Sequence, residues 1–221
     1  MKAYIEGIEA LKDVDPDIRL MTTEPLIAIS SDTNASPEDQ KLASERHEHQ
    51  FQVLDMLSGR LCPELRGRPE YLDIIGLNFY YNNQWVLPSH EFLCWKDAKT
   101  DPRWVPLHTL LTAVFQRYGR PLVLSETSHP LEDRPLWMSM IAEESATAIQ
   151  AGIPLLGICW YPLIDRPDWD HLEIWHAAGI WGPVAPLQGD HSRVQHQPTA
   201  AAFLAAQTHV GVAKNIPMKG P

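Results

Sequence analysis

Residues 120–130 have the sequence RPLVLSETSHP, and they decide how the rest of the chain is interpreted. An apolar run typical of a buried strand, Leu122 to Leu124, ends there in small polar residues and one carboxylate, Glu126. Parallel α/β barrels present catalytic groups in this way, because the loops that follow their strands form the mouth of the barrel. Glu126 is therefore the first candidate for chemistry, and the alternative is that it only caps the helix that follows.

Strand-like and helix-like segments alternate along the chain. Apolar residues recur at helical spacing in residues 3–13, 37–59, 105–118, 135–151 and 199–208. The strand-like segments are residues 18–29, which Glu24-Pro25 interrupts, 72–81, 122–125 and 155–161. A long loop is expected over 82–103, and residues 162–197 show no clear periodicity. Four strand and helix units joined by right-handed crossovers imply a parallel sheet, either a barrel segment or a doubly wound sheet, within a single domain over residues 1–221.

The composition is that of a globular protein that acts on small molecules. The chain has 221 residues, 44% of them hydrophobic, and a formal net charge of −10. This acidic balance disfavours nucleic acid, whose phosphates need a basic surface, and no apolar run is long enough to cross a membrane. The three cysteines are widely spaced and odd in number, which indicates reduced thiols in a cytoplasmic protein. Eight tryptophans and six tyrosines, several of them beside polar residues, suit the faces and hydroxyls of a sugar.

Three segments of the chain, in order, resemble motifs of the family 1 glycoside hydrolases, the β-glucosidase and β-galactosidase group. The family's sixth-strand motif, D-F-I-G-x-N-Y-Y, is similar to residues 71–81, YLDIIGLNFYY. Its seventh-strand P-x-x-x-T-E-N-G resembles RPLVLSETS, and its eighth-strand G-Y-x-x-W-S-L-x-D-N-x-E-W resembles GICWYPLIDRPDWD, residues 157–170. The resemblance implies an α/β fold of the (β/α)8 TIM-barrel type, with this chain supplying about half of the barrel, strands five to eight.

Carried over residue by residue, the resemblance implies catalytic roles for two side chains. Glu126 matches the family's nucleophile, which attacks the anomeric carbon and forms a glycosyl-enzyme. Tyr80 matches the second tyrosine of the sixth-strand motif, whose hydroxyl holds the nucleophile. Asn78 matches the asparagine of that motif, which faces the sugar near its 2-hydroxyl.

The eighth-strand motif implies the remaining contacts with a sugar. Trp160 matches the tryptophan that forms the platform under the sugar ring. Asp168 and Trp169 match the Glu-Trp pair that contacts hydroxyls at the far end of the glycone. One extra residue separates Trp160 from Trp169 in this chain. Asp165 of the same segment is also expected among the residues that bind the sugar.

The second carboxyl group that retaining hydrolysis needs is not assigned by the resemblance. The family's general acid/base stands in an N-E-P sequence at the end of strand four, and strands one to four have no counterpart here. Thr23-Glu24-Pro25 is similar in letters, but only one strand, residues 72–81, separates it from Glu126. Glu24 is therefore expected on strand five, where an acid/base role and a structural role at a strand-to-loop turn are both open.

A half-barrel would leave two strand edges unpaired, and such edges recruit a partner. A homodimer or higher homo-oligomer is therefore expected, and two copies related by a two-fold axis can close one barrel. In that arrangement Asp165 and Asp168 of one copy would stand near the site of the other. The alternative is that the chain is a fragment of a longer glycosidase.

The function expected from these observations is retaining hydrolysis of β-galactosides or β-glucosides, without a cofactor. The rival interpretation is a carbohydrate-binding remnant that keeps the sugar site and lacks the second carboxylate. No metal is expected, because His171, Glu173 and His176 form H-x-E-x-x-H rather than the H-E-x-x-H zinc helix. His129, three residues after Glu126, can line a sugar site or simply cap.

Overall fold

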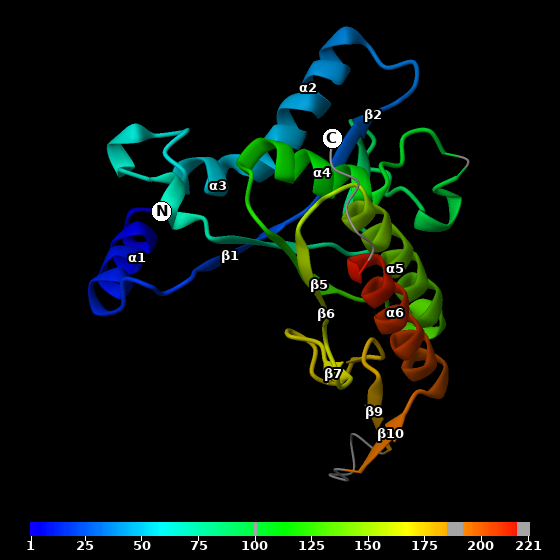
Figure 1. Ribbon diagram of the computed structural model, residues 1–221. Helices are drawn as coiled ribbons and strands as arrows, with labels where there is room; N and C mark the ends of the chain where they lie inside the picture. Colours follow the sequence, from blue (N-terminus) through cyan, green and yellow to red (C-terminus); the bar gives the residue numbers. More distant parts are fainter. Residues whose placement is uncertain (100, 185–191, 216–221) are drawn as a thin grey trace.

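The computed structural model describes residues 1–99, 101–184 and 192–215 (Figure 1). Its main sheet has four parallel strands in the order β1-β3-β5-β6. Their bounds are Met21–Pro25 for β1, Ile74–Asn78 for β3, Leu122–Thr127 for β5 and Leu155–Trp160 for β6. The α/β class and the partial parallel sheet agree with the prediction. Strands β1, β3 and β6 fall inside segments that the sequence marks as strand-like, and β5 extends two residues beyond its predicted segment, 122–125.

Six α-helices are present in the described ranges, and each of them overlaps one of the five segments where the periodicity predicts a helix. Their bounds are Lys2–Val14 for α1, Pro37–Glu48 for α2, Gln52–Leu57 for α3, Leu107–Tyr118 for α4, Arg134–Gln150 for α5 and Gln197–Asn215 for α6. Ser36 caps α2, because its hydroxyl accepts from the backbone N–H of Asp39 and Pro37 occupies the first turn. The helix expected over 37–59 is divided by a 3₁₀ turn, His49–Phe51, so that α3 is a separate short helix. Further 3₁₀ turns are Pro63–Leu65, Pro69–Tyr71, Trp95–Asp97 and Leu131–Asp133.

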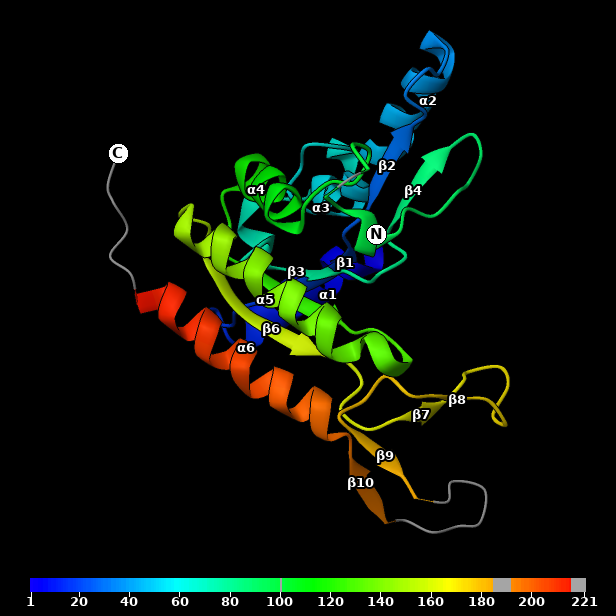
Figure 2. The ribbon, with the colours of Figure 1, turned by 90° about the vertical axis from the view of Figure 1, so that its right-hand side faces the viewer.

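Helices cover one face of the main sheet. Figures 1 and 2 show α6 running beside α5, with α4 next to α5. The core between these helices and the strands is apolar, and its fully buried members include Leu107, Leu111, Trp137, Ile75, Leu77, Leu122 and Leu124. Burying each such side chain contributes about 1.5–3 kcal/mol, so this layer supplies much of the stability.

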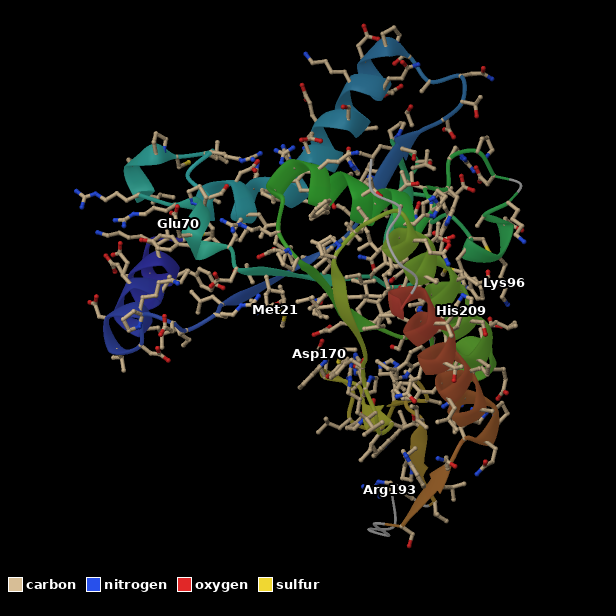
Figure 3. All side chains as sticks on the ribbon, in the orientation of Figure 1. Met21, Glu70, Lys96, Asp170, Arg193 and His209 are labelled. Carbon is tan, nitrogen blue, oxygen red and sulfur yellow. The ribbon has the colours of Figure 1, made fainter. Side chains whose placement is uncertain are left out.

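The other face of the main sheet is open. Met21 on β1 and Leu156 on β6 are 45% and 46% exposed, and Met21 is labelled at the start of β1 in Figure 3. Gly76 of β3 lies on this face, because a Cβ added there would stand 2.6 Å from Thr23 Cγ2 and 2.9 Å from Ser125 Oγ. A side chain at residue 76 would therefore require the side chains of Thr23 and Ser125 to move.

A small second sheet was not expected from the sequence. The segment 18–29 forms two strands in different sheets, because β2, Ala28–Ser31, leaves the main sheet after Pro25. It pairs in parallel with β4, Gln84–Leu87, which lies inside the predicted loop 82–103. Short local patterns of four residues do not reveal such a pairing, since the partners are more than fifty residues apart.

The segment after β6 has more structure than its lack of periodicity indicates. Two short antiparallel pairs form there: β7, Arg166–Pro167, with β8, Trp175–His176, and β9, Trp181–Pro183, with β10, Arg193–Gln195. Residues 185–191 of this segment lie outside the described ranges. The last helix is longer than the predicted 199–208. None of the helices in the described ranges combines the length and apolar character needed to span a bilayer.

Candidate active site

A pocket of about 410 Å³ lies at the carboxyl ends of β3, β5 and β6, beside the β7–β8 pair. Figure 3 labels Asp170, in the turn between β7 and β8, below the main sheet. Four aromatic rings contribute to the walls, and rings of this kind pack against the apolar faces of sugars. The residues that line the pocket are Tyr80, Tyr81, Asn82, Glu126, Ser128, Pro130, Tyr161, Pro162, Arg166, Trp169, His176 and Ala178.

Glu126 and Tyr80 meet in this pocket. The Tyr80 hydroxyl donates to Glu126 Oε2 at 2.9 Å, and the backbone holds the two residues together, because the N–H of Phe79 donates to the carbonyl of Glu126 at 2.9 Å. Burial raises the pKa of Tyr80 well above its usual range, and the hydrogen bond to Glu126 raises it further. The phenol therefore keeps its proton and stays a donor to the carboxylate.

Asn78 lies beside Glu126 in the sheet and is its register partner across β3 and β5. The Ser125 hydroxyl donates to Asn78 Oδ1 at 2.7 Å. Because the amide oxygen is engaged, the amide NH2 group is the part of Asn78 that remains for another acceptor. The structure therefore brings Tyr80 and Glu126 into contact and places Asn78 next to Glu126 in the sheet, although Asn78 is not among the residues that line the pocket.

Trp160 does not line this pocket, whereas its chain neighbour Tyr161 does. Trp160 is 9% exposed and donates from Nε1 to the carbonyl of Ala178 at 2.9 Å on the helix-covered side of the sheet. The next residue, Tyr161, lines the pocket with Glu126. Trp169 is the eighth residue after Tyr161, and the second tryptophan of the W-S-L-x-D-N-x-E-W motif is likewise the eighth residue after the first. Trp169 is the ninth residue after Trp160. This spacing was the signal that could have identified Tyr161.

Asp165 is engaged in holding the loop after β6. Its Oδ1 accepts from the backbone N–H of Gly179 at 2.7 Å and lies 3.9 Å from Arg134 Nη1. Burial raises the pKa of Asp165, and the hydrogen bond from Gly179 opposes that rise. Asp165 is not among the residues that line the pocket. The structure therefore places it as a support for the loop.

Asp168 organises the β7–β8 turn. Its carboxylate accepts from His176 Nε2 at 2.7 Å and from the backbone N–H groups of Asp170 and His171 at 2.9 and 3.0 Å. The hydrogen bond from His176 is the largest of the effects that lower the pKa of Asp168 to about 2. Its neighbour Trp169 is 76% exposed and lines the pocket.

Arg166 brings a positive charge into the pocket that the sequence did not single out. Its guanidinium carbon lies 4.9 Å from the ring centroid of Trp169 and 6.0 Å from that of Tyr161. Its Nε is buried without a hydrogen-bond partner. No local sequence signal distinguishes this arginine from others in the chain.

His129 supports the wall of the pocket. Its Nε2 lies 3.1 Å from Trp95 Nε1, whose N–H it accepts, and its Nδ1 bonds to the carbonyl of Pro130 at 2.8 Å. The imidazole packs on the ring of Tyr81 with centroids 4.5 Å apart. His129 is buried, so it positions Tyr81 and does not itself line the pocket.

Glu24 stands at the end of β1, the edge strand of the main sheet. Burial raises the pKa of its carboxyl. One strand, β3, separates it from Glu126 on β5, which corresponds to roughly 10 Å between the two backbones. Among the described residues that line the pocket, Glu126 is the one carboxylate. The described side chains form no cluster of three metal-ligating residues.

The fold is similar to part of the barrel in solved structures of family 1 glycosidases. The structure of the family 1 β-glucosidase from Thermotoga maritima matches with a TM-score of 0.70 at 16% identity, over 96% of this chain and 55% of that one. A β-glucosidase from Thermotoga maritima in complex with glucoimidazole matches with a TM-score of 0.67 at 16% identity, over 92% and 54%. A family 1 glycoside hydrolase from the same organism, complexed with a cyclophellitol analogue transition state mimic, matches with a TM-score of 0.70 at 16% identity, over 94% and 55%.

The expected resemblance to family 1 is thereby confirmed at the level of the fold. The chain spans about half the length of these solved structures. No protein-family model matches the chain, and no curated protein does so.

Proposed function

We propose that the chain is a retaining β-glycosidase module in which Glu126 attacks the anomeric carbon of a β-glucoside or β-galactoside. The observation that carries this proposal is the Glu126 carboxylate at the end of β5, held by the Tyr80 hydroxyl at 2.9 Å in a pocket with aromatic walls. Solved structures with this fold hold glucoimidazole in one case and galacto-hydroximolactam in another, so both glycones stay in the proposal.

The proposed reaction assigns a separate part to each side chain. Tyr80 engages Glu126 Oε2, so we assign the attack to Oε1. Oε1 bonds to C1 while the bond from C1 to the leaving oxygen breaks, and water later displaces the ester with overall retention. The Asn78 amide is assigned to the 2-hydroxyl, and Tyr161 replaces Trp160 as the aromatic surface under the sugar.

The group that protonates the leaving oxygen is proposed to come from outside this pocket. Retaining hydrolysis places two carboxyl groups about 5 Å apart, and Asp165 and Asp168 are both engaged in holding loops. Glu24 is the remaining candidate in this chain, because its raised pKa suits an acid. Its position beyond β3 favours a carboxyl supplied by another polypeptide.

A homo-oligomer is proposed as the source of that polypeptide. The two outer strands of the main sheet, β1 and β6, each have one neighbour in it, and one face of the sheet is open. A second copy that covers these edges would bring further carboxyl groups to the mouth. Mixing inactive Glu126→Gln with inactive Glu24→Gln should restore part of the activity if the two groups act across copies. The mass of the protein in solution is measured by light scattering. Full activity on alkyl glycosides from a protein that is a monodisperse monomer by this measurement would contradict the oligomer.

We also propose a cytoplasmic location and a small neutral partner. Three cysteines in the described ranges, Cys62, Cys94 and Cys159, are free thiols, as expected of a reducing compartment. The formal charge of −10 supports a neutral sugar over a nucleic acid as the partner.

The lone carboxylate favours one rival function, a carbohydrate-binding protein without turnover. Substrates with different leaving groups separate the two. Dinitrophenolate departs without a proton, so an intact nucleophile alone supports its release, whereas an alkoxide needs the acid. Release of dinitrophenolate from its β-glucoside supports the nucleophile, and sugar binding without release supports the rival.

Azide tests the roles of the two carboxyl groups. Glu126→Ala should lower turnover of a nitrophenyl β-glycoside by roughly a thousandfold or more, and azide should restore part of it with an inverted, α-configured glycosyl azide. In the unsubstituted chain, azide should instead give the retained, β-configured product. Glu173→Ala, which removes an exposed carboxylate, is the control and should keep full activity. Unchanged turnover in Glu126→Ala would remove this residue from the mechanism.

A further inference from the structure

A second cavity, of about 300 Å³, lies on the helix-covered side of the main sheet. It is bordered by β6, α5 and α6, and it is open to solvent on one side, where the lining residue Gln207 is exposed. Figure 2 shows α6 running beside α5 and β6. Small residues face one another there, because Ala142 comes from α5, Ala206 and Gly211 from α6, and Gly157 from β6. The helices therefore meet without filling the space between them. His209, labelled on α6 in Figure 3, does not line it.

The lining of this cavity is almost entirely apolar. Its large members are Met138, Ile141, Trp160 and Phe203, and no charged side chain lines it in the part of the chain that the structure describes. One of its two polar side chains, Thr127, already accepts from Trp137 Nε1 at 2.9 Å. A charged ligand would lose its hydration here without gaining a partner, which costs several kcal/mol. An uncharged apolar ligand loses nothing comparable.

We propose that this cavity is a binding site for one small uncharged, largely apolar molecule of bicyclic aromatic size. Helices and strands normally pack closely against one another, so an apolar pocket of about 300 Å³ between them is unusual. An apolar cavity of about 150 Å³ accommodates benzene, and twice that volume fits two fused rings. Met138 has a flexible thioether that adapts to such a guest and contacts its ring favourably.

The site is distinct from the candidate active site and independent of the proposed reaction. Thr127 and Trp160 are register partners on β5 and β6, and both face this cavity. Their chain neighbours, Glu126 and Tyr161, line the other pocket. The two pockets therefore lie on opposite sides of the same two strands.

Titration calorimetry with 2-naphthol tests the proposal on the full chain. We expect one molecule bound per chain, and at least tenfold weaker binding of 2-naphthoate, which has the same rings and a carboxylate. Ala142→Leu and Gly211→Leu place a larger side chain in the cavity and should each weaken 2-naphthol binding at least tenfold. At Gly211 an added Cβ meets no atom within 4 Å. Gly7→Leu, on the exposed side of α1, is the matched control with the same open surroundings and should bind as the unsubstituted chain does.

Thermal unfolding by circular dichroism shows that each variant is folded before it is titrated. If Ala142→Leu does not fold, Gly211→Leu decides the result alone. Absence of saturable 2-naphthol binding at millimolar concentration would overturn the proposal. Equal affinity for the naphthoate, or unchanged affinity in the folded cavity-filling variants, would overturn it as well.

Discussion

Tyr80→Phe removes a single hydroxyl from the candidate active site and leaves its ring in place. That hydroxyl donates to Glu126 Oε2 at 2.9 Å. A hydrogen bond to a charged group contributes about 1.5–3 kcal/mol, and every 1.4 kcal/mol corresponds to about a factor of ten. If Tyr80→Phe removes this whole contribution to holding Glu126 in position in the transition state, glycosyl transfer to Glu126 should slow by roughly 10- to 150-fold.

The loss in Tyr80→Phe should be the same across the neutral and mildly alkaline range. Burial, followed by the bond to Glu126, raises the pKa of Tyr80. A raised pKa means that the folded chain holds this proton more tightly than the unfolded chain. The hydroxyl thus stays protonated, and the stability linked to it is lost only as the pH rises above about 10, the value for an unfolded tyrosine.

The assay is the release of dinitrophenolate from 2,4-dinitrophenyl 2-deoxy-2-fluoro-β-glucoside, which reports glycosyl transfer without a proton donor. Tyr81→Phe is the matched control, because Tyr81 lines the same pocket and packs on His129. It should react within about twofold of the unsubstituted chain, as a surface-lining hydroxyl contributes little. A rate for Tyr80→Phe within that same range, or an equal loss in Tyr81→Phe, would refute the reasoning.

Three further changes test other parts of the account. Asn78→Ala should lose much less rate on a 2-deoxy glycoside than on the parent, and equal losses on both would show that Asn78 is only structural. Burial raises the pKa of Glu24, so its ionised form is disfavoured in the folded chain. Glu24→Gln should therefore increase the free energy of unfolding, measured in urea, at pH 7 but not at pH 3, where the carboxyl is protonated in both states. An unchanged free energy of unfolding at pH 7 would contradict this. Gly179→Ala should destabilise the chain by about 1–3 kcal/mol, because the new Cβ would stand 2.6–2.8 Å from backbone atoms of residues 163–165. Gly157→Ala, whose Cβ meets nothing within 4 Å, is its control, and equal melting temperatures of the two would contradict the clash.

The main sheet and the end of β5 could be predicted from the sequence because their signals are local. Continuous apolar runs mark β3, β5 and β6, and a carboxylate directly after such a run lies at the mouth of a parallel sheet. The contact between Tyr80 and Glu126 followed from the family motif, since it joins residues on neighbouring strands.

The errors arise where register or distant pairing decides the structure. The motif match assigned the sugar platform to Trp160, and a one-residue shift along a strand moves a side chain to the other face of the sheet. Trp160 is therefore buried behind the sheet, while Tyr161 lines the pocket. The pairing of β2 with β4 was missed because four-residue strands leave little periodicity. The partners of Asp165 and Asp168 in these contacts, the backbone N–H of Gly179 and the imidazole of His176, lie 14 and 8 residues further along the chain, and the fold brings them close.

The most direct test of the central claim is to locate the sugar that the chain traps. Incubation with the 2-fluoro glycoside should leave one covalent glycosyl group per chain, which peptide mapping by mass spectrometry should place on Glu126. Glu126→Gln, checked for an intact fold by circular dichroism, should remain unlabelled. Labelling of a different residue, or no labelling of a folded chain at saturating reagent, would contradict Glu126 as the nucleophile.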